Sequence, residues 1–281
     1  MKEKQGKTLW TVILVVCAVI AAACIGVLIW LHATEAAAER QIAEAVKPYE
    51  PSAVPQRPIV QTPAPTPAAS AAPTPEIPAE PADVPIDFDY LQGINPDIYG
   101  WIDLTCTGQG YPVLSNAVDP DRYLHLDVNG FYANAGSLYS QSTFNRTEFV
   151  DPCTVIFGHN MTSGRMFGKL QSTAPLRNLD DEESTMNYFT MYTPTKIQKY
   201  RICAAGVFSN QNVLYFYDFS DEDSFAQFFE DFESYPQGIH YISETFKPQF
   251  GDKLAVLSTC YTMNNRYRFL TIGVMVEEEG I

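Results

Sequence analysis

The hydrophobic residues first gather in one uninterrupted apolar segment near the N-terminus. Residues 9–31 carry no charge and are numerous enough to cross a lipid bilayer as a helix. Lysines precede this segment within residues 1–8, and the first charged residues after it are glutamates. Because positive residues tend to stay on the cytoplasmic side, we expect a short cytoplasmic N-terminus over residues 1–8, a transmembrane anchor over residues 9–31 and an extracellular remainder.

Two other interpretations of this segment compete with an uncleaved anchor. The small residues Ala36 to Ala38 are typical of a signal-peptide cleavage site, and Ala-Ala-Cys24 resembles a lipidation site. The apolar segment is longer than an ordinary signal-peptide core, and it continues past Cys24 to Leu31. Its length therefore favours the anchor.

Alanine and proline dominate the segment after the anchor. Residues 35–49 predict a short helix ending near Pro48, and proline then recurs throughout residues 50–85. Such a composition cannot bury a core and is typical of an extended, semi-rigid spacer. We therefore expect residues 32–85 to form an extracellular stalk that leads to a folded domain over residues 86–281.

In that domain the hydrophobic pattern is mostly one of short β-like runs separated by Asn, Gly and Pro. Such spacing predicts a mainly β fold, a barrel or a sandwich. The predicted strands are Tyr111–Ser115, Gly136–Tyr139, Thr154–Phe157, Tyr188–Tyr192, Tyr200–Phe208, Lys253–Thr259 and Phe269–Val276.

Two helices are also predicted. A short one covers Asp87–Gly93 and stops before Asn95-Pro96, since the residue before proline disfavours the helical conformation. The longer one is capped by Ser220 or Asp221 and ends before Pro236. It carries a stripe of phenylalanines that we expect to pack in the core: Phe225, Phe228, Phe229 and Phe232.

Composition and charge narrow the class of protein. Hydrophobic residues make up 46% of the chain and charged residues 18%, which is typical of a globular protein with a core. The formal net charge is -15. A nucleic-acid-binding surface needs basic residues to neutralise phosphates, so this charge argues against a nucleic-acid partner.

Six cysteines suggest disulfides until their positions are considered. Cys17 and Cys24 fall in the apolar segment, and the other four are widely separated without a C-x-x-C pair, which argues against zinc. Two disulfides are formally possible, but buried free thiols are the simpler expectation. The four histidines are dispersed and indicate no metal site. The cysteines of the folded domain are Cys106, Cys153, Cys203 and Cys260.

Three residues stand where a side chain can face a cleft. Cys260 ends the apolar run KLAVLSTC, and His159 follows the run TVIFG. Arg268 begins the apolar run RFLTIGVMV, where its guanidinium can point across a strand pair toward Cys260, and Arg266 is a rival two residues away. Each has an ordinary alternative: an inert buried thiol, a structural histidine and a surface ion pair.

Taken together, these segments resemble two signature regions of class B sortases. The first reads FGHNMTSGRMFGKL and the second LSTCYTMNNRYRFLTIGVMV. The earlier segments INPDIYGWIDL, YPVLS and YLHLDVNGFYANAGSLY are also similar to the N-terminal half of that family. The resemblance extends from about Ile86 to Val276 in the family's order.

The resemblance implies a fold and a set of site residues. The fold is a closed, eight-stranded sortase-type β-barrel with N-terminal helices and a helix in the loop between strands six and seven. The implied roles are Cys260 as the nucleophile, His159 as the general acid/base, and Arg268 as the residue that binds the oxyanion or orients the substrate. Whether Arg266 shares that role stays open. Two residues beside the nucleophile, Ser258 and Thr259, are weaker candidates for contact with the substrate backbone.

The resemblance also implies a reaction and its partners. A cysteine transpeptidase of this kind attacks a sorting-signal pentapeptide of the LPxTG or NPxTx type in a surface protein. It then passes the acyl group from its thioacyl intermediate to an amine of a peptidoglycan precursor or a pilin. Neither a metal nor an organic cofactor is required. The expected location is the outer face of the membrane of a Gram-positive type cell.

Two alternatives have different consequences. A cell-wall cysteine peptidase would share the thioacyl intermediate, although its usual order of Cys before His is reversed here. A non-catalytic surface binding protein would not need Cys260. A wall-anchored adhesin would be expected to end in a sorting motif, whereas this sequence ends in VEEEGI.

Overall fold

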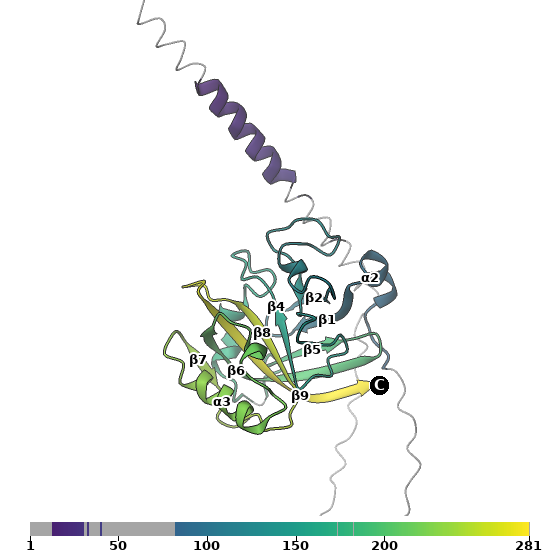
Figure 1. Cartoon of the computed structure of the whole chain (residues 1–281), viewed down its shortest axis with the longest axis vertical. Helices are drawn as coiled ribbons and strands as arrows, with labels where there is room; N and C mark the ends of the chain where they lie inside the picture. Colours follow the sequence, from purple (N-terminus) through teal and green to yellow (C-terminus); the bar gives the residue numbers. More distant parts are fainter. Residues whose placement is uncertain are drawn as a thin grey trace, which may run out of the picture.

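The computed structural model describes residues 13–30, 33, 40, 82–172, 174–181 and 183–280. One helix near the N-terminus, Ile13–Trp30, is long and apolar enough to cross a membrane (Figure 1). The predicted helix over residues 35–49 and the Pro-rich segment over residues 50–81 lie outside the described residues, apart from position 40.

Within the described residues, nine strands form one sheet that closes on itself (Figure 1). The strand order is β5-β1-β2-β3-β4-β8-β9-β6, and pairing of β5 with β6 completes an eight-stranded barrel. Strand β7 pairs only with β6 and lies outside the closed ring. The strands are β1 (Ile98–Leu104), β2 (Gln109–Leu114), β3 (Leu138–Tyr139), β4 (Cys153–Phe157), β5 (Tyr188–Tyr192), β6 (Lys196–Ser209), β7 (His240–Ile242), β8 (Leu254–Cys260) and β9 (Tyr267–Gly280).

The barrel is mixed, with both parallel and antiparallel strand pairs. β2 pairs with β3 in parallel and β4 pairs with β8 in parallel, whereas the other strand pairs are antiparallel. In the β4–β8 pair, Phe157 lies opposite Ser258. The carboxyl ends of β4 and β8 therefore lie side by side at the same end of the barrel.

The predicted closed barrel is confirmed, with two strands that the pattern did not predict. All residues of β1 but one are buried, so it shows no alternation of polar and apolar positions, and the three residues of β7 are too few to show one. β6 begins four residues before its predicted start and β9 continues past its predicted end to Gly280, and in this added ladder Lys199 pairs with Glu277. Most of the added residues are polar or charged, and a hydrophobic pattern therefore misses them.

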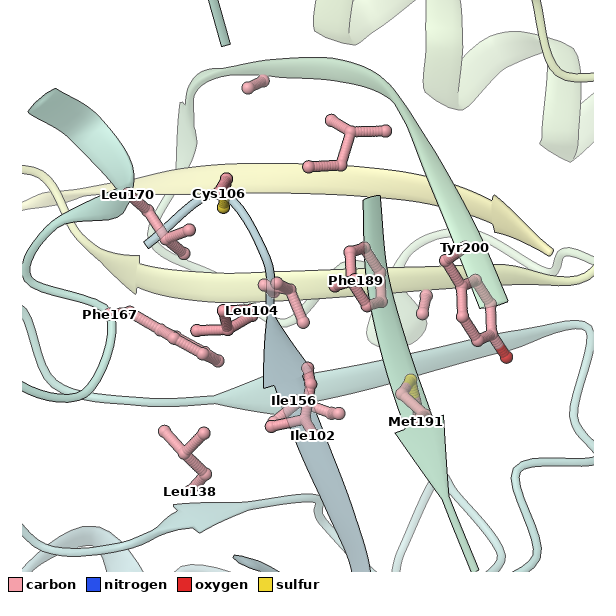
Figure 2. Packing of buried hydrophobic residues seen from close by; sticks show 14 of the residues in the cluster. Ile102, Leu104, Cys106, Leu138, Ile156, Phe167, Leu170, Phe189, Met191 and Tyr200 are labelled. Atoms are coloured by element: carbon pink, nitrogen blue, oxygen red, sulfur yellow. The ribbon is translucent and has the colours of Figure 1, made fainter. Parts of the chain in front are cut away.

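Strand alternation sorts the buried side chains onto two faces of the barrel wall. On β8, Ala255 and Leu257 belong to the cluster inside the barrel, whereas Leu254 and Val256 pack on the outer face. Figure 2 shows side chains of the inner cluster, contributed by β1, β3, β4, β5 and β6, filling the barrel. The interior of the barrel is a packed core.

Both predicted helices are present. α2 (Phe88–Ile94) is capped by Asp87, and α3 (Glu222–Glu233) is capped by Asp221, whose carboxylate accepts a hydrogen bond from the Ser224 amide. α3 follows β6 and precedes β8, so it lies in the loop between the sixth and seventh strands of the barrel, as expected. Its buried phenylalanines, Phe225, Phe228 and Phe232, join the cluster on the outer face.

The cysteines of the domain are free thiols, as expected, and the alternative of disulfide bonds is not realised. Cys106, Cys153 and Cys203 are buried, whereas Cys260 is only half-buried. Burial raises the pKa of Cys106 to about 11 and that of Cys203 to about 12, and it also raises the pKa of Cys153. These three thiols therefore stay protonated at neutral pH.

Candidate active site

Cys260 is the last residue of β8, at the carboxyl end of that strand. It lies directly opposite Arg268, the second residue of β9, in the antiparallel β8–β9 pair. Side chains of directly opposed residues share one face of a sheet and approach each other closely. The Arg268 guanidinium accordingly donates a hydrogen bond from Nη1 to Cys260 Sγ over 2.6 Å.

Arg266 is placed differently from Arg268. It precedes β9 and is exposed, and its backbone N–H donates to Oδ1 of Asn264 in the turn. Because Arg266 lies in the turn before β9, it does not share a strand face with Arg268. Arg268 is the arginine that contacts the sulfur.

The parallel register brings the His159 loop to the level of Cys260. Phe157 and Ser258 are paired, and the Gly158 amide donates to the Ser258 carbonyl over 3.1 Å. His159 and Cys260 each lie two residues beyond that pair. Adjacent strands are about 4.8 Å apart, so the geometry of the sheet places the two candidate residues at one end of the barrel on neighbouring chain segments.

The imidazole of His159 is fixed through one of its nitrogens. Nε2 lies 2.7 Å from the carbonyl oxygen of Leu124, at the end of a 3-10 turn (Arg122–Leu124). A carbonyl oxygen can only accept a hydrogen bond, so Nε2 carries the proton. In the neutral ring, Nδ1 is then the basic nitrogen. The ring also stacks on His125, with 5.4 Å between ring centroids.

Several groups act on the charge of His159. Burial lowers its pKa below the ordinary value of 6.5, the Leu124 carbonyl opposes this by raising the pKa, and the neighbouring charges of His125 and Arg268 lower it further. The net direction is downward, so the neutral imidazole predominates at neutral pH.

The two weaker candidates lie on opposite faces of β8. Ser258 is two residues before Cys260, so the two side chains lie on the same face of β8. Ser258 is 5% exposed, and its carbonyl accepts a hydrogen bond from the Gly158 amide. Thr259 alternates to the inner face and is 2% exposed. The Thr259 hydroxyl has no hydrogen-bond partner. Neither side chain is openly presented to solvent.

Tyr261, the residue after Cys260, uses its amide within the protein. Its N–H donates to the carbonyl of Tyr267 over 3.0 Å, and its side chain packs against the inner cluster. The guanidinium of Arg268 is therefore the donor seen at the sulfur, and the amide of Tyr261 is occupied elsewhere.

Sequence reasoning does not identify the partners that orient His159. Leu124 contacts His159 through its backbone carbonyl, and every residue type has such a group, so the sequence cannot indicate this contact. The sequence around His125 gives no sign of a role. Its stacking on His159 depends on how the 122–124 turn packs against the end of the barrel where β4 and β8 finish. Among the described residues, no group of three His, Cys, Asp or Glu side chains is arranged to hold a metal ion.

Comparisons with known proteins agree with this fold. Sortase B of Listeria monocytogenes is 30% identical over 175 residues, which cover 61% of this chain and 66% of that protein, just under two thirds of its length. Sortase B of Staphylococcus aureus is 25% identical over 173 residues, covering 62% of this chain and 67% of that protein.

The solved structure of sortase B from B. anthracis is similar with a TM-score of 0.55 and 26% identity, covering 70% of this chain and 88% of that one. No family model matches the chain.

Proposed function

We propose that the chain is a class B sortase, a membrane-anchored cysteine transpeptidase that joins sorting-signal proteins to an amine. The observation that carries this proposal is the hydrogen bond between Arg268 and a half-buried Cys260, next to the loop that holds His159. The other three thiols of the domain are buried and lie elsewhere in the barrel.

In the proposed reaction, the Cys260 sulfur attacks the carbonyl carbon of a substrate threonine, and its proton passes to Nδ1 of His159. The C–N bond then breaks, and the leaving amine takes that proton from His159. A second amine attacks the thioester and gives up a proton to His159, after which Cys260 leaves and is reprotonated. The scheme consumes no oxidant and needs no cofactor.

Arg268 would stabilise the oxyanion that forms in each tetrahedral intermediate. Its contact with the sulfur supports this role, because the carbon under attack would lie within bonding distance of that sulfur. Because the Tyr261 amide is bonded to Tyr267, this role falls on the guanidinium. Losing one such donor typically lowers kcat by about 10²–10³-fold.

The sorting signal would be of the LPxTG or NPxTx type, and the amine would come from peptidoglycan or a pilin. A cavity of about 530 Å³ is lined by Phe208, Ser209 and Tyr235, among others. Phe208 is the residue of β6 paired with Arg268, so this cavity adjoins the proposed site. Its mixed polar and aromatic lining suits part of an extended peptide.

The membrane helix gives the proposed enzyme its location. Ile13–Trp30 has the length and composition to span a bilayer, and lysines lie on its N-terminal side. This charge distribution supports a single pass with the barrel outside the cell. Substrate proteins and the amine acceptor would meet the enzyme at that outer surface.

The test uses the full chain in detergent, incubated with peptides of both motif types, with and without triglycine or a lysine peptide. We expect an acyl adduct on Cys260, and we expect added amine to remove that acyl group from Cys260 and form an amide product. Cys260→Ala should form neither species. Peptide cleavage with no amide product would make the protein a peptidase. An unmodified Cys260 that also resists iodoacetamide would overturn the assignment of the nucleophile.

A further inference from the structure

The backbone carbonyl of Cys260 is bound by two side-chain amides. Nδ2 of Asn160 donates to it over 3.0 Å, and Nε2 of Gln171 donates over 2.7 Å. Cys260 ends its strand, where a carbonyl is ordinarily left to water. Two distant segments of the chain instead converge on this one oxygen.

The contact from Asn160 extends the parallel ladder past the end of β4. The last backbone bond of that ladder joins Gly158 to Ser258. The chain then turns away from β8, because Asn160 forms a bridge with Met166 and the His159 carbonyl accepts from Phe167. The Asn160 side chain reaches back to β8 two residues further on. His159 is thereby held between two points that are bonded to the nucleophile strand.

Gln171 completes a closed network on the other side. Its Oε1 accepts from the Thr262 amide over 2.9 Å and from the Thr262 hydroxyl over 3.0 Å. The same hydroxyl accepts from Nδ2 of Asn160 over 2.8 Å. The His159 loop, the 3-10 turn Leu170–Ser172 and the segment after Cys260 are therefore joined by side-chain amides and one hydroxyl.

Such a network constrains the orientation of the Cys260 peptide and hence the direction of its side chain. Displacement of the Cys260 backbone would break both amide contacts and move Sγ relative to the Arg268 guanidinium. Displacement of the His159 loop would break the Asn160 contact. One set of hydrogen bonds thus couples the base, the nucleophile and the segment leading to Arg268.

We propose that Asn160 and Gln171 are positioning residues for acyl transfer, and that they fix the spacing of His159 and Cys260 through the Cys260 carbonyl. This inference rests on the proposed transpeptidase function for its kinetic consequence. Its geometric part concerns only the thiol and is testable without substrate. Reactions that depend on alignment lose about 10²-fold in rate when the groups shift by about 1 Å.

The variants remove one donor each without adding charge: Asn160→Leu and Gln171→Met, alone and together, in the full chain. Thr262→Ser is the conservative variant that keeps both contacts with Gln171. Ser172→Ala is the matched control, since this neighbouring exposed hydroxyl donates only to Lys169 of its own turn. Three quantities are measured: the pH profile of iodoacetamide labelling mapped to Cys260, kcat and KM for transfer, and Tm.

We expect each donor variant to lower kcat about tenfold, as for the loss of one hydrogen bond, with KM for the peptide unchanged. The double variant should lose about 10²-fold. The labelling profile of Cys260 should change in all three, and Thr262→Ser and Ser172→Ala should match the wild type. Unchanged labelling profiles, with kcat losses that only follow a fall in Tm, would overturn the proposal.

If the wild type transfers no acyl group at all, the proposed function fails, and the labelling profiles alone decide this inference. A profile altered by Asn160→Leu and Gln171→Met supports positioning of the thiol. A profile identical to that of the wild type refutes it.

Discussion

At the scale of single residues, what distinguishes Cys260 is its surroundings. Cys106 and Cys203 are enclosed by apolar side chains, and burial raises the pKa of each thiol to about 11 and about 12. Cys260 is half-buried and has a guanidinium nitrogen 2.6 Å from its sulfur. A nucleophilic thiol needs access and a polar partner, and Cys260 has both.

The contact between Arg268 and the sulfur predicts that this arginine cannot be replaced. Arg268→Lys keeps the charge but loses the planar fork of donors, and Arg268→Ala loses both. We expect acyl-enzyme formation to slow by about 10²–10³-fold in Arg268→Ala, with Arg268→Lys closer to Ala than to the wild type. Single-turnover mass spectrometry measures this rate.

Arg266→Ala is the matched control, because Arg266 is exposed and precedes β9. It should react at the wild-type rate. Equal losses at positions 266 and 268 would contradict the assignment of the role to Arg268.

The environment of His159 predicts a specific pH dependence. Its folded-state pKa lies below the unfolded value of about 6.5. As pH falls below 6.5 the unfolded state takes up the proton first, so stability is lost between 6.5 and the lower folded-state pKa. Above 6.5 both states are neutral and the contribution is constant.

NMR titration of labelled histidine should therefore give a midpoint below 6.5 for His159, with the proton on Nε2 in the neutral form. His159→Gln should remove this acid-dependent loss of unfolding free energy, which chemical denaturation across the same pH range measures. A midpoint above 6.5 would show that the Leu124 carbonyl outweighs burial.

At the scale of elements, the parallel β4–β8 pair aligns the site and helix α3 supports the outer face of the same wall. β8 carries Cys260 at its end, and its outward residues Leu254 and Val256 share a cluster with Phe228 and Phe232 of the helix. The strand that carries Cys260 is thus held from outside by aromatic packing.

Neighbouring phenylalanines of α3 predict contrasting effects on stability. Phe228 is fully buried, and Phe228→Ala should cost about 3–5 kcal/mol of unfolding free energy through the cavity it leaves. Phe229 is only partly buried at the edge of the same cluster, so Phe229→Ala should cost clearly less. Denaturant unfolding of both variants provides the comparison. Equal losses of unfolding free energy in the two variants would mean that the packing of α3 on the outer face does not depend on its buried phenylalanines.

Elements with a clear period could be predicted from the sequence, and those without one could not. β5 coincides with its predicted bounds. The stripe of four phenylalanines indicates the helix α3, and its start follows the predicted cap, Asp221. β1 is buried on both faces and β7 has three residues, so neither shows a period. Closure of the barrel also depends on pairing between strands far apart in the sequence, such as β1 with β5 and β6 with β9, which a local pattern does not contain.

The candidate site divides in the same way. Cys260, His159 and Arg268 are side chains at strand ends, positions that a sequence reveals. The Leu124 carbonyl and the double contact on the Cys260 carbonyl involve backbone atoms, which every residue possesses. Their roles depend on the strand register and on the conformation of the loops, which the folded structure shows and the sequence does not.

At the scale of the whole molecule, the chain enters the barrel at the end remote from the site. The Ala82 amide donates to the Thr195 carbonyl, and Thr195 adjoins the Lys196–Gly280 pair at the far end of β9. From Arg268 to Gly280 the strand rises about 3.3 Å per residue, or about 40 Å in all. A tether that enters the barrel at Ala82 would thus leave the Cys260 end on the opposite side.

This separation predicts a role for the Pro-rich segment over residues 50–81. With the tether removed, the end of the barrel nearest the membrane would be the one opposite Cys260. The domain could not then turn its site toward substrates held in the same membrane. We expect a Pro-rich spacer, which in the extended form spans about 3.1 Å per residue, to allow that reorientation. Deleting residues 50–81 should therefore slow reaction with a membrane-anchored substrate in liposomes while leaving reaction with a soluble peptide unchanged.

A Gly/Ser spacer of equal length is the control, and it should restore the membrane-bound reaction because reach, rather than sequence, is what the tether supplies. Slower reaction with the soluble peptide would instead mean that residues 50–81 support the barrel itself. Unchanged rates with both substrates would mean that the barrel reaches the membrane surface without a tether. The comparison thus separates the chemistry, which depends on the Cys260 end of the barrel, from its delivery, which depends on the Ala82 end.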